Sequence, residues 1–325
     1  MERRIEFDIM KGIGILLVML GHSHIFHSAC VLPPTLSYII GSFHVPLFFI
    51  VAGYFSKTYS ENVLNTLSRY FKRLCIPYIL TSVIIILYNA LLAYKRQSLE
   101  LFTGIVGSYL FADTSGIISS SMGFPRDMGV GPIWFLLALF WAKSLFFLIS
   151  KSGKYTYLIC FILSWGFSYI EVPMPFMLRQ GITALAFVAI GHWWKNFSFP
   201  KWFVISGIVC WIIEIIFRIG ISPYSAHYAI YPLNLIGAFG ATYIIYLCSL
   251  GIAKVKYINN IIDSIGNNSM NVLCAHTMDM RCNVIRLVLK HIPIVNIVPW
   301  LFVGIEYTIV LVLSYVPLIR QQKNK

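Results

Sequence analysis

Runs of apolar residues alternate with short polar segments along almost the whole chain. Ten of these runs are about 17 to 25 residues long, the length that an α-helix needs to cross the hydrocarbon core of a bilayer. The runs lie at residues 7–27, 38–56, 75–94, 132–150, 155–171, 175–194, 202–219, 229–250, 270–290 and 296–319. The pattern predicts an all-α integral membrane protein, a bundle of about ten transmembrane helices.

Two stretches depart from this pattern. Leu99 to Phe111 is apolar but too short to cross a bilayer, so we expect an interfacial or re-entrant helix there. The run 270–290 is the weakest of the ten, because polar and charged residues interrupt it at Asn271, His276, Asp279 and Arg281.

Composition supports the membrane assignment. Of the 325 residues, 58% are hydrophobic and 11% are charged, whereas a soluble domain carries about 25% charged residues. The surplus of apolar side chains must face lipid. The seven cysteines are scattered without paired spacing, which argues against a disulfide framework and against a zinc site. We expect no bound metal.

The distribution of basic residues predicts the orientation. With the N-terminus inside, fifteen Lys and Arg residues fall on the inner side of the predicted topology and eight on the outer side. Both ends are therefore expected to be cytoplasmic, in a multi-pass protein of the cell membrane. The net charge of +13 lies in short loops rather than on one face, so nucleic acid is not an expected partner. We expect one transmembrane domain over residues 1–325 and no appended soluble domain.

The first run contains several ionisable residues, which are costly inside a membrane and mark functional sites. On an α-helix, Lys11 and His22 lie within about 20° of one line and roughly 16 Å apart along it. They cannot touch, but they can hold two ends of one extended ligand. The alternative is that Lys11 reaches the inner surface or pairs with Asp8, and that His22 is an ordinary interfacial histidine.

Other candidates lie at the ends of later runs. His44 precedes Pro46 at the start of the second run and either faces the first helix or caps its own. Arg69, Lys72 and Arg73 form an inner basic cluster that either binds phosphates or only fixes orientation.

The longest connection, Lys95 to Gly131, is expected outside. It carries Arg126 and Asp127 and leads into Trp134, which are candidates for contact with a polar substrate. Interfacial aromatic residues are the alternative for Trp134. Glu306 lies within the tenth run and needs a partner or a wet cavity.

Several of these segments resemble the membrane acyltransferase 3 family. Asp8 to Val18, running on to Gly21-His22, resembles its opening, and so does Phe43-His44-Val45-Pro46-Leu47-Phe48-Phe49 followed by Gly53-Tyr54. The hallmark of that family is a basic residue, ten residues and then a histidine, a spacing that Lys11 and His22 match. Trp134-Phe135-Leu136 resembles a later helix start, and Ile265 to Met270, leading to His276, resembles its near-terminal motif. Among its branches, the chain is most similar to the fucose O-acetylase type.

The resemblance implies transfer of an acetyl group to a hydroxyl of a sugar in a surface polysaccharide, a lipid-linked glycan or a glycolipid. Acetyl-CoA is the implied donor, a substrate rather than a permanently bound cofactor, and the bilayer is the remaining partner. A sugar hydroxyl needs a positioned base, and histidine is the natural choice near neutral pH. His22 is the first candidate for the base and His44 the helper, and a covalent acetyl-histidine is also open.

Further roles follow from the same resemblance. Lys11, Arg69, Lys72 and Arg73 are candidates for binding the donor. Arg126, Asp127, Trp134 and His276 are candidates for binding the acceptor. The rival function is a transporter or flippase, although the sequence has no evident inverted repeat. A structural subunit without chemistry leaves the Lys11–His22 stripe unexplained.

Overall fold

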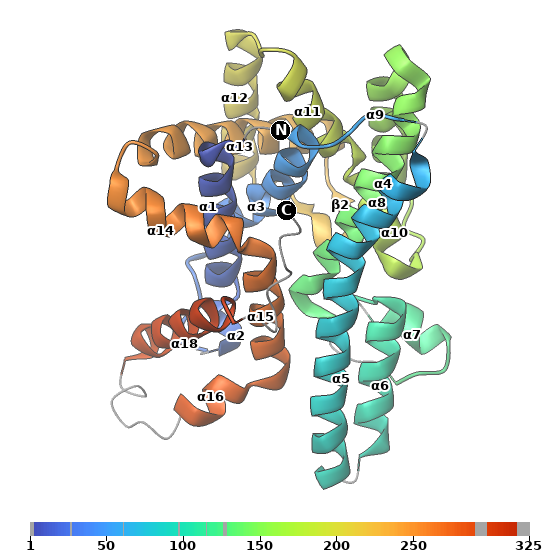
Figure 1. The fold of residues 1–325 in the computed structure, drawn as a ribbon, viewed down its shortest axis with the longest axis vertical. Helices are drawn as coiled ribbons and strands as arrows, with labels where there is room; N and C mark the ends of the chain where they lie inside the picture. The colour runs from blue at the N-terminus through green and yellow to red at the C-terminus, as the bar shows by residue number, and fades with distance from the viewer. Residues whose placement is uncertain are drawn as a thin grey trace. The chain divides into compact units, whose positions relative to one another are not determined.

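The computed structural model describes residues 3–26, 28–60, 62–96, 98–114, 116–125, 129–289 and 298–316. The described chain is almost entirely helical (Figure 1). The helices are α1 (Ile5–Gly21), α2 (Ser23–Phe26), α3 (Pro34–Tyr54), α4 (Val63–Tyr70), α5 (Ile76–Arg96), α6 (Leu99–Phe111), α7 (Ile117–Ser121), α8 (Trp134–Ile149), α9 (Thr156–Tyr169), α10 (Leu178–Thr183), α11 (Leu185–Asn196), α12 (Lys201–Phe217), α13 (Tyr231–Ile252), α14 (Lys256–Asn267), α15 (Ser269–Cys282), α16 (Val284–Leu289) and α18 (Pro299–Leu313).

Short irregular elements join these helices. A π-helical turn, η1 (Phe71–Cys75), connects α4 to α5, and 3₁₀ turns lie at Gly131–Ile133, Ser150–Tyr155, Pro175–Met177 and Pro223–Ser225. The strands β1 (Ile221–Ser222) and β2 (His227–Tyr228) form a two-residue antiparallel ribbon.

Each of the ten predicted apolar runs contains a helix, so the all-α class is confirmed. Within the described ranges, four helical stretches are long and apolar enough to cross a membrane: Pro34–Tyr54, Val63–Lys95, Gly131–Tyr169 and Tyr231–Ile252. These stretches make the chain a multi-pass membrane protein. The count of ten spans and the cytoplasmic location of both ends stay predictions.

The helices differ from several of the predicted runs. α1 ends at Gly21, where His22 forms a turn before α2, so the first run is not one continuous helix. The run 270–290 is divided into α15 and α16 at Asn283, which has a left-handed backbone (φ 55°) that asparagine tolerates. The amphipathic helix α14 was not predicted, because its isoleucines alternate with polar residues and give no apolar run.

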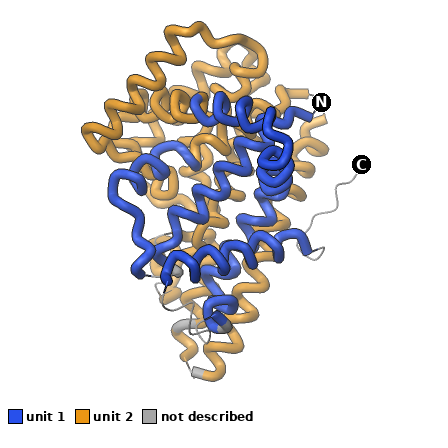
Figure 2. Tube along the Cα trace, turned by 90° about the vertical axis from the view of Figure 1, so that its left-hand side faces the viewer, with its two compact units in different colours: residues 1–44, 244–325 blue, residues 45–243 orange. Residues whose placement is uncertain are grey.

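The chain forms two compact units (Figure 2). Unit 1 contains Met1–His44 and Ile244–Lys325, and unit 2 contains Val45–Tyr243. The boundaries fall within α3 and α13.

In unit 1, α1 and α14 cross at two glycines. A Cβ atom on Gly12 would lie 2.3 Å from the carbonyl oxygen of Ile262, and one on Gly266 would lie 1.7 Å from the carbonyl oxygen of Asp8. Only glycine permits this backbone contact, which is the way small residues bring membrane helices together. The crossing joins two segments that are about 250 residues apart in sequence and that both belong to the motifs singled out above.

Unit 2 contains a similar crossing of α3 and α11. A Cβ atom on Gly53 would lie 2.1 Å from the carbonyl oxygen of Val188, and one on Gly191 would lie 1.9 Å from that of Ile50. Around it, α8 packs against α9, α10 and α11, and α5 lies beside α6 (Figure 1).

Candidate active site

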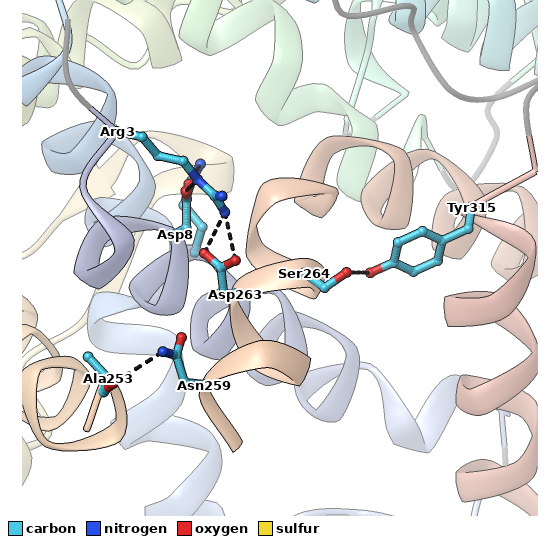
Figure 3. A network of polar contacts seen from close by, with 8 residues as sticks. Arg3, Asp8, Ala253, Asn259, Asp263, Ser264 and Tyr315 are labelled. Carbon is cyan, nitrogen blue, oxygen red and sulfur yellow. Dashed lines mark hydrogen bonds and ion pairs between the residues drawn. The ribbon is translucent and has the colours of Figure 1, made fainter. Parts of the chain in front are cut away.

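At the start of α1, a network of charges surrounds Asp8, whose residue is 8% exposed. Lys11 Nζ lies 2.6 Å from Asp8 Oδ1, and Arg3 Nε donates to Asp8 Oδ2 at 3.0 Å. Arg3 Nη2 also donates to both oxygens of Asp263 on α14, at 2.7 and 2.6 Å (Figure 3). The two carboxylates raise the pKa of the Arg3 guanidinium. Lys11 is therefore held in an ion pair one turn from Asp8, as the pairing alternative predicted.

The close contact of α1 and α14 at Gly12 and Gly266 brings the charged residues of this network together. Asp263 is one turn before Gly266 on α14, and Asp8 and Gly12 are one turn apart on α1, so the backbone contact brings the charged side chains together. The contact between Arg3 and Asp263 was not predicted, because the two residues are 260 positions apart in sequence.

The other end of α1 carries His22, the half-buried residue at its C-cap. The His22 Nδ1 atom lies 2.8 Å from the carbonyl oxygen of Val18. A carbonyl only accepts hydrogen bonds, so Nδ1 carries the proton in the neutral ring. The lone pair of the neutral imidazole is consequently on Nε2, where it can accept a proton from a substrate.

Two rings from the C-terminal part of the chain lie close to His22. His276 on α15 is fully buried, and the centroids of its ring and the His22 ring are 5.5 Å apart. Tyr307 on α18 packs edge-on against His276 at 5.7 Å, and its hydroxyl donates to the carbonyl oxygen of Met19. The structure thus brings His22 and His276, both predicted site residues, into one cluster and adds Tyr307, which was not predicted.

His44 repeats the geometry of His22. Its Nδ1 atom lies 2.7 Å from the carbonyl oxygen of Ile40, one turn earlier on α3, so its neutral ring also keeps the lone pair on Nε2. A positive charge on the His44 ring and a positive charge on the His22 ring would repel each other. The two rings therefore belong to the same electrostatic environment.

Two buried carboxyl groups lie on α15 and α18, the helices that carry His276 and Tyr307. Asp279 on α15 is 5% exposed and Glu306 on α18 is fully buried, and their charges interact. Like charges this close in an apolar interior cannot both ionise, so the pair needs a proton or a cation.

Asn268 ties α15 to α18. It is the N-cap residue of α15, but its side chain donates to the carbonyl and hydroxyl oxygens of Ser314, at 3.1 and 2.8 Å. Asn271 in turn donates to Asn268 Oδ1 at 2.7 Å. This part of the near-terminal motif fastens the helices that carry His276 and Tyr307.

In unit 2, the predicted basic cluster lies on α4 and η1, where Arg69, Lys72 and Arg73 are exposed. A fourth basic residue, Lys143 on α8, is close enough to Arg73 for their charges to repel. Its Nζ atom lies 5.0 Å from the centroid of the Tyr70 ring. Lys143 was not among the predicted site residues, although a lysine within an apolar run is itself a signal of function.

The predicted acceptor residues are only partly placed. Trp134 is buried at the start of α8, and its ring packs edge-on against Tyr224 at 5.8 Å. Arg126 and Asp127 lie outside the described residues. Within the described ranges, no three His, Cys, Asp or Glu side chains lie together as metal ligands would.

Comparison with protein-family models gives one decisive result. The acyltransferase domain of the acyltransferase 3 family matches residues 4–318, nearly the entire chain. The chain belongs to the acyltransferase 3 family. Comparison of this acyltransferase with curated proteins and with solved structures gives no match. His22, His44 and Asn268, which lie in its motifs, all belong to unit 1, the unit that holds the histidine cluster.

Proposed function

We propose that this membrane acyltransferase moves an acetyl group from acetyl-CoA to a hydroxyl of a sugar, in a surface polysaccharide, a lipid-linked glycan or a glycolipid. The observation that carries the proposal is the hydrogen bond from His22 Nδ1 to the Val18 carbonyl, which leaves Nε2 as a base. A general base of this kind contributes about 10²- to 10⁴-fold to a rate.

In the direct route, His22 Nε2 accepts the proton of the sugar hydroxyl while its oxygen attacks the thioester carbonyl carbon. The carbon–sulfur bond then breaks, and the coenzyme A thiolate takes the proton from the imidazolium. His276 packs against the His22 ring and Tyr307 packs against His276, so the two hold the orientation of the base.

In the covalent route, Nε2 itself attacks the thioester carbonyl carbon, the carbon–sulfur bond breaks and coenzyme A leaves as the thiolate, which gives an acetyl-imidazolium. The sugar oxygen then attacks the acetyl carbon, the carbon–nitrogen bond breaks to regenerate neutral His22, and the hydroxyl proton goes to the coenzyme A thiolate. Both routes use the same lone pair of His22. His44, with the same tautomer, is the second candidate for either role.

For the donor, we keep Arg69, Lys72 and Arg73 as candidates for contact with the nucleotide phosphates, and Lys11 as the candidate nearer the pantetheine arm. The acceptor candidates are Trp134, His276, Arg126 and Asp127. We also infer a ten-span topology in the cell membrane with both ends cytoplasmic, which the positive-inside distribution supports.

The test uses radiolabelled acetyl-CoA and membranes that contain the wild type, His22→Gln or the matched control His24→Gln. His24 is an exposed histidine two residues away. We expect His22→Gln to lower acetyl transfer to the glycan fraction about 10²-fold or more, and His24→Gln to leave it within a factor of two. Label that wild type retains covalently before the acceptor is added identifies the acetyl-histidine route.

Equal transfer by wild type and folded His22→Gln contradicts the assigned base. No transfer by any variant, together with movement of a solute across vesicles, favours the transporter instead.

A further inference from the structure

Along α5 of unit 2 runs an open groove with a volume of about 440 Å³. Its walls come from α5, α6, α8 and the turns η1 and Pro175–Met177. All of these elements belong to unit 2, and α5 and α6 lie side by side in Figure 1. The groove shares no residue with the histidine cluster.

The few polar atoms of the wall are all turned towards the protein backbone. The Tyr78 hydroxyl donates to the carbonyl oxygen of Tyr109 at 2.7 Å, and the Ser82 hydroxyl donates to that of Tyr78 at 2.7 Å. Trp141 Nε1 donates to the carbonyl oxygen of Phe176 at 2.9 Å. A polar ligand would lose its water in this groove without gaining a partner, whereas a hydrocarbon chain would lose nothing.

The length of the groove fits one leaflet of a bilayer. From the end of η1 into α5 the wall extends from Cys75 to Ile86, which is roughly 16 Å along a helix. Half of the hydrocarbon core is about 15 Å thick. Ile79 and Val83 on this wall are both 46% exposed, within a stretch that is apolar enough to cross a membrane.

Positive charge lies at one end of the groove. Phe71 and Cys75 belong to both the wall and η1, the turn that also carries Lys72 and Arg73. On α8, Phe140 lines the groove and packs edge-on against Phe71 at 6.2 Å, and Lys143 follows it by one turn. π-helical turns are rare and occur often at functional sites.

Lys143 is unusual because its neighbours do not neutralise it. Its nearest interactions are the Tyr70 ring and the like charge of Arg73, and within the described ranges no carboxylate pairs with it. Two like charges at one end of an apolar groove favour the binding of an anion between them.

We propose that this groove binds a phosphate-bearing anionic lipid, with one hydrocarbon chain along α5 and the phosphate between Arg73 and Lys143. The positive charge at one end of the groove and its length of one leaflet favour a lipid over a helix from a second copy of the chain. Such a helix would have to lie across both the charged end and the apolar wall. By the positive-inside rule this lipid belongs to the cytoplasmic leaflet. Arg73 is also a candidate for the donor, so the test contains no acetyl-CoA.

The test uses the full chain in phosphatidylcholine nanodiscs with a trace of photoactivatable lipid. The two probes are a phosphatidylglycerol and a phosphatidylcholine that carry the same diazirine in one acyl chain. Peptide mapping locates the crosslinks. We expect the phosphatidylglycerol probe to label α5 and α6 more strongly than the phosphatidylcholine probe.

Two pairs of variants separate the chain from the headgroup. Val83→Trp fills the groove, whereas the control Ile84→Trp adds the same ring to the next residue, which is 48% exposed and outside the wall. Val83→Trp is expected to lower labelling by both probes several-fold, and Ile84→Trp to leave it unchanged. Ile79→Trp repeats the test from the same wall if Val83→Trp does not fold.

The second pair replaces a lysine over a tyrosine ring. Lys143→Gln is expected to lower the preference for phosphatidylglycerol about fivefold, the equivalent of about 1 kcal/mol for one basic side chain near a lipid headgroup. The control is Lys151→Gln, whose Nζ atom lies 5.4 Å from the Tyr59 ring centroid. It is expected to keep the preference.

Equal labelling of Val83→Trp and Ile84→Trp overturns the lipid site, and so does equal labelling of wild type by the two probes. A dimer that Val83→Trp converts to a monomer, without lipid crosslinks in the groove, assigns the surface to a second copy. None of these outcomes bears on acetyl transfer by His22, so the two proposals fail independently.

Discussion

Single hydrogen bonds determine which nitrogen of each candidate histidine is available. His22 and His44 both donate Nδ1–H to the carbonyl one turn earlier, and the neutral ring of each keeps its lone pair on Nε2. The sequence predicts that both histidines lie near a membrane interface. The tautomer of each ring follows from a local backbone contact that the composition does not show.

At the same scale, Asp8 is expected to contribute more to stability than an exposed carboxylate. Asp8→Asn removes the charge that faces both Lys11 and Arg3, and we expect a loss of about 1–3 kcal/mol, typical of hydrogen bonds to charged groups. Thermal unfolding in detergent, followed by tryptophan fluorescence, measures the loss.

The control for this prediction is Glu6→Gln. Among the described residues Glu6 forms one ion pair, with Arg4, whereas Asp8 forms two, so the expected effect is smaller. Equal destabilisation by the two variants would show that the network around Asp8 contributes no more to the free energy of unfolding than the Arg4–Glu6 pair.

Among the elements, the crossing of α1 and α14 depends on the absence of a side chain at Gly12. In Gly12→Ala the new methyl group meets the backbone of Ile262, which cannot move as a side chain does. We expect a loss of about 1–3 kcal/mol from overpacking, together with reduced acetyl transfer. The free energy of unfolding and the transfer assay are measured on the same preparation.

Gly21→Ala is the matched change on the same helix. A Cβ atom there meets nothing within 4 Å, so the variant is expected to be neutral or slightly stabilising. If Gly12→Ala behaves like Gly21→Ala, the close crossing does not hold α1 and α14 together.

The elements also show what the sequence could and could not predict. Every long apolar run contains one or more helices, because backbone groups that are buried or exposed to lipid must be satisfied within the protein. α14 escaped detection because its twelve residues are amphipathic, and the break at Asn283 escaped because it depends on one backbone angle. The proximity of His22 to His276 depends on tertiary packing across more than 250 residues, which no local pattern contains.

For the whole molecule, the predicted topology is tested by the side on which two exposed positions react. In a Cys248→Ser background, which removes the exposed native thiol, Thr58→Cys is expected to be cytoplasmic and Ser121→Cys external. A membrane-impermeant maleimide added to intact cells should label Ser121→Cys and leave Thr58→Cys unlabelled until the cells are opened. The reverse pattern would invert the orientation.

Unit 1 is assembled from both ends of the chain, which sets an order of events during synthesis. After Gly21 has emerged, α1 must wait for the ribosome to reach Lys256, roughly 10 to 50 s at about 5–20 residues per second. Throughout that interval Arg3 lacks its second carboxylate partner, Asp263, and Gly12 has no backbone against it. His22 has neither His276 nor Tyr307 beside it. An unfinished chain therefore carries its base in the membrane without the packing that orients it, and the newborn protein has no assembled histidine cluster until its last third is made.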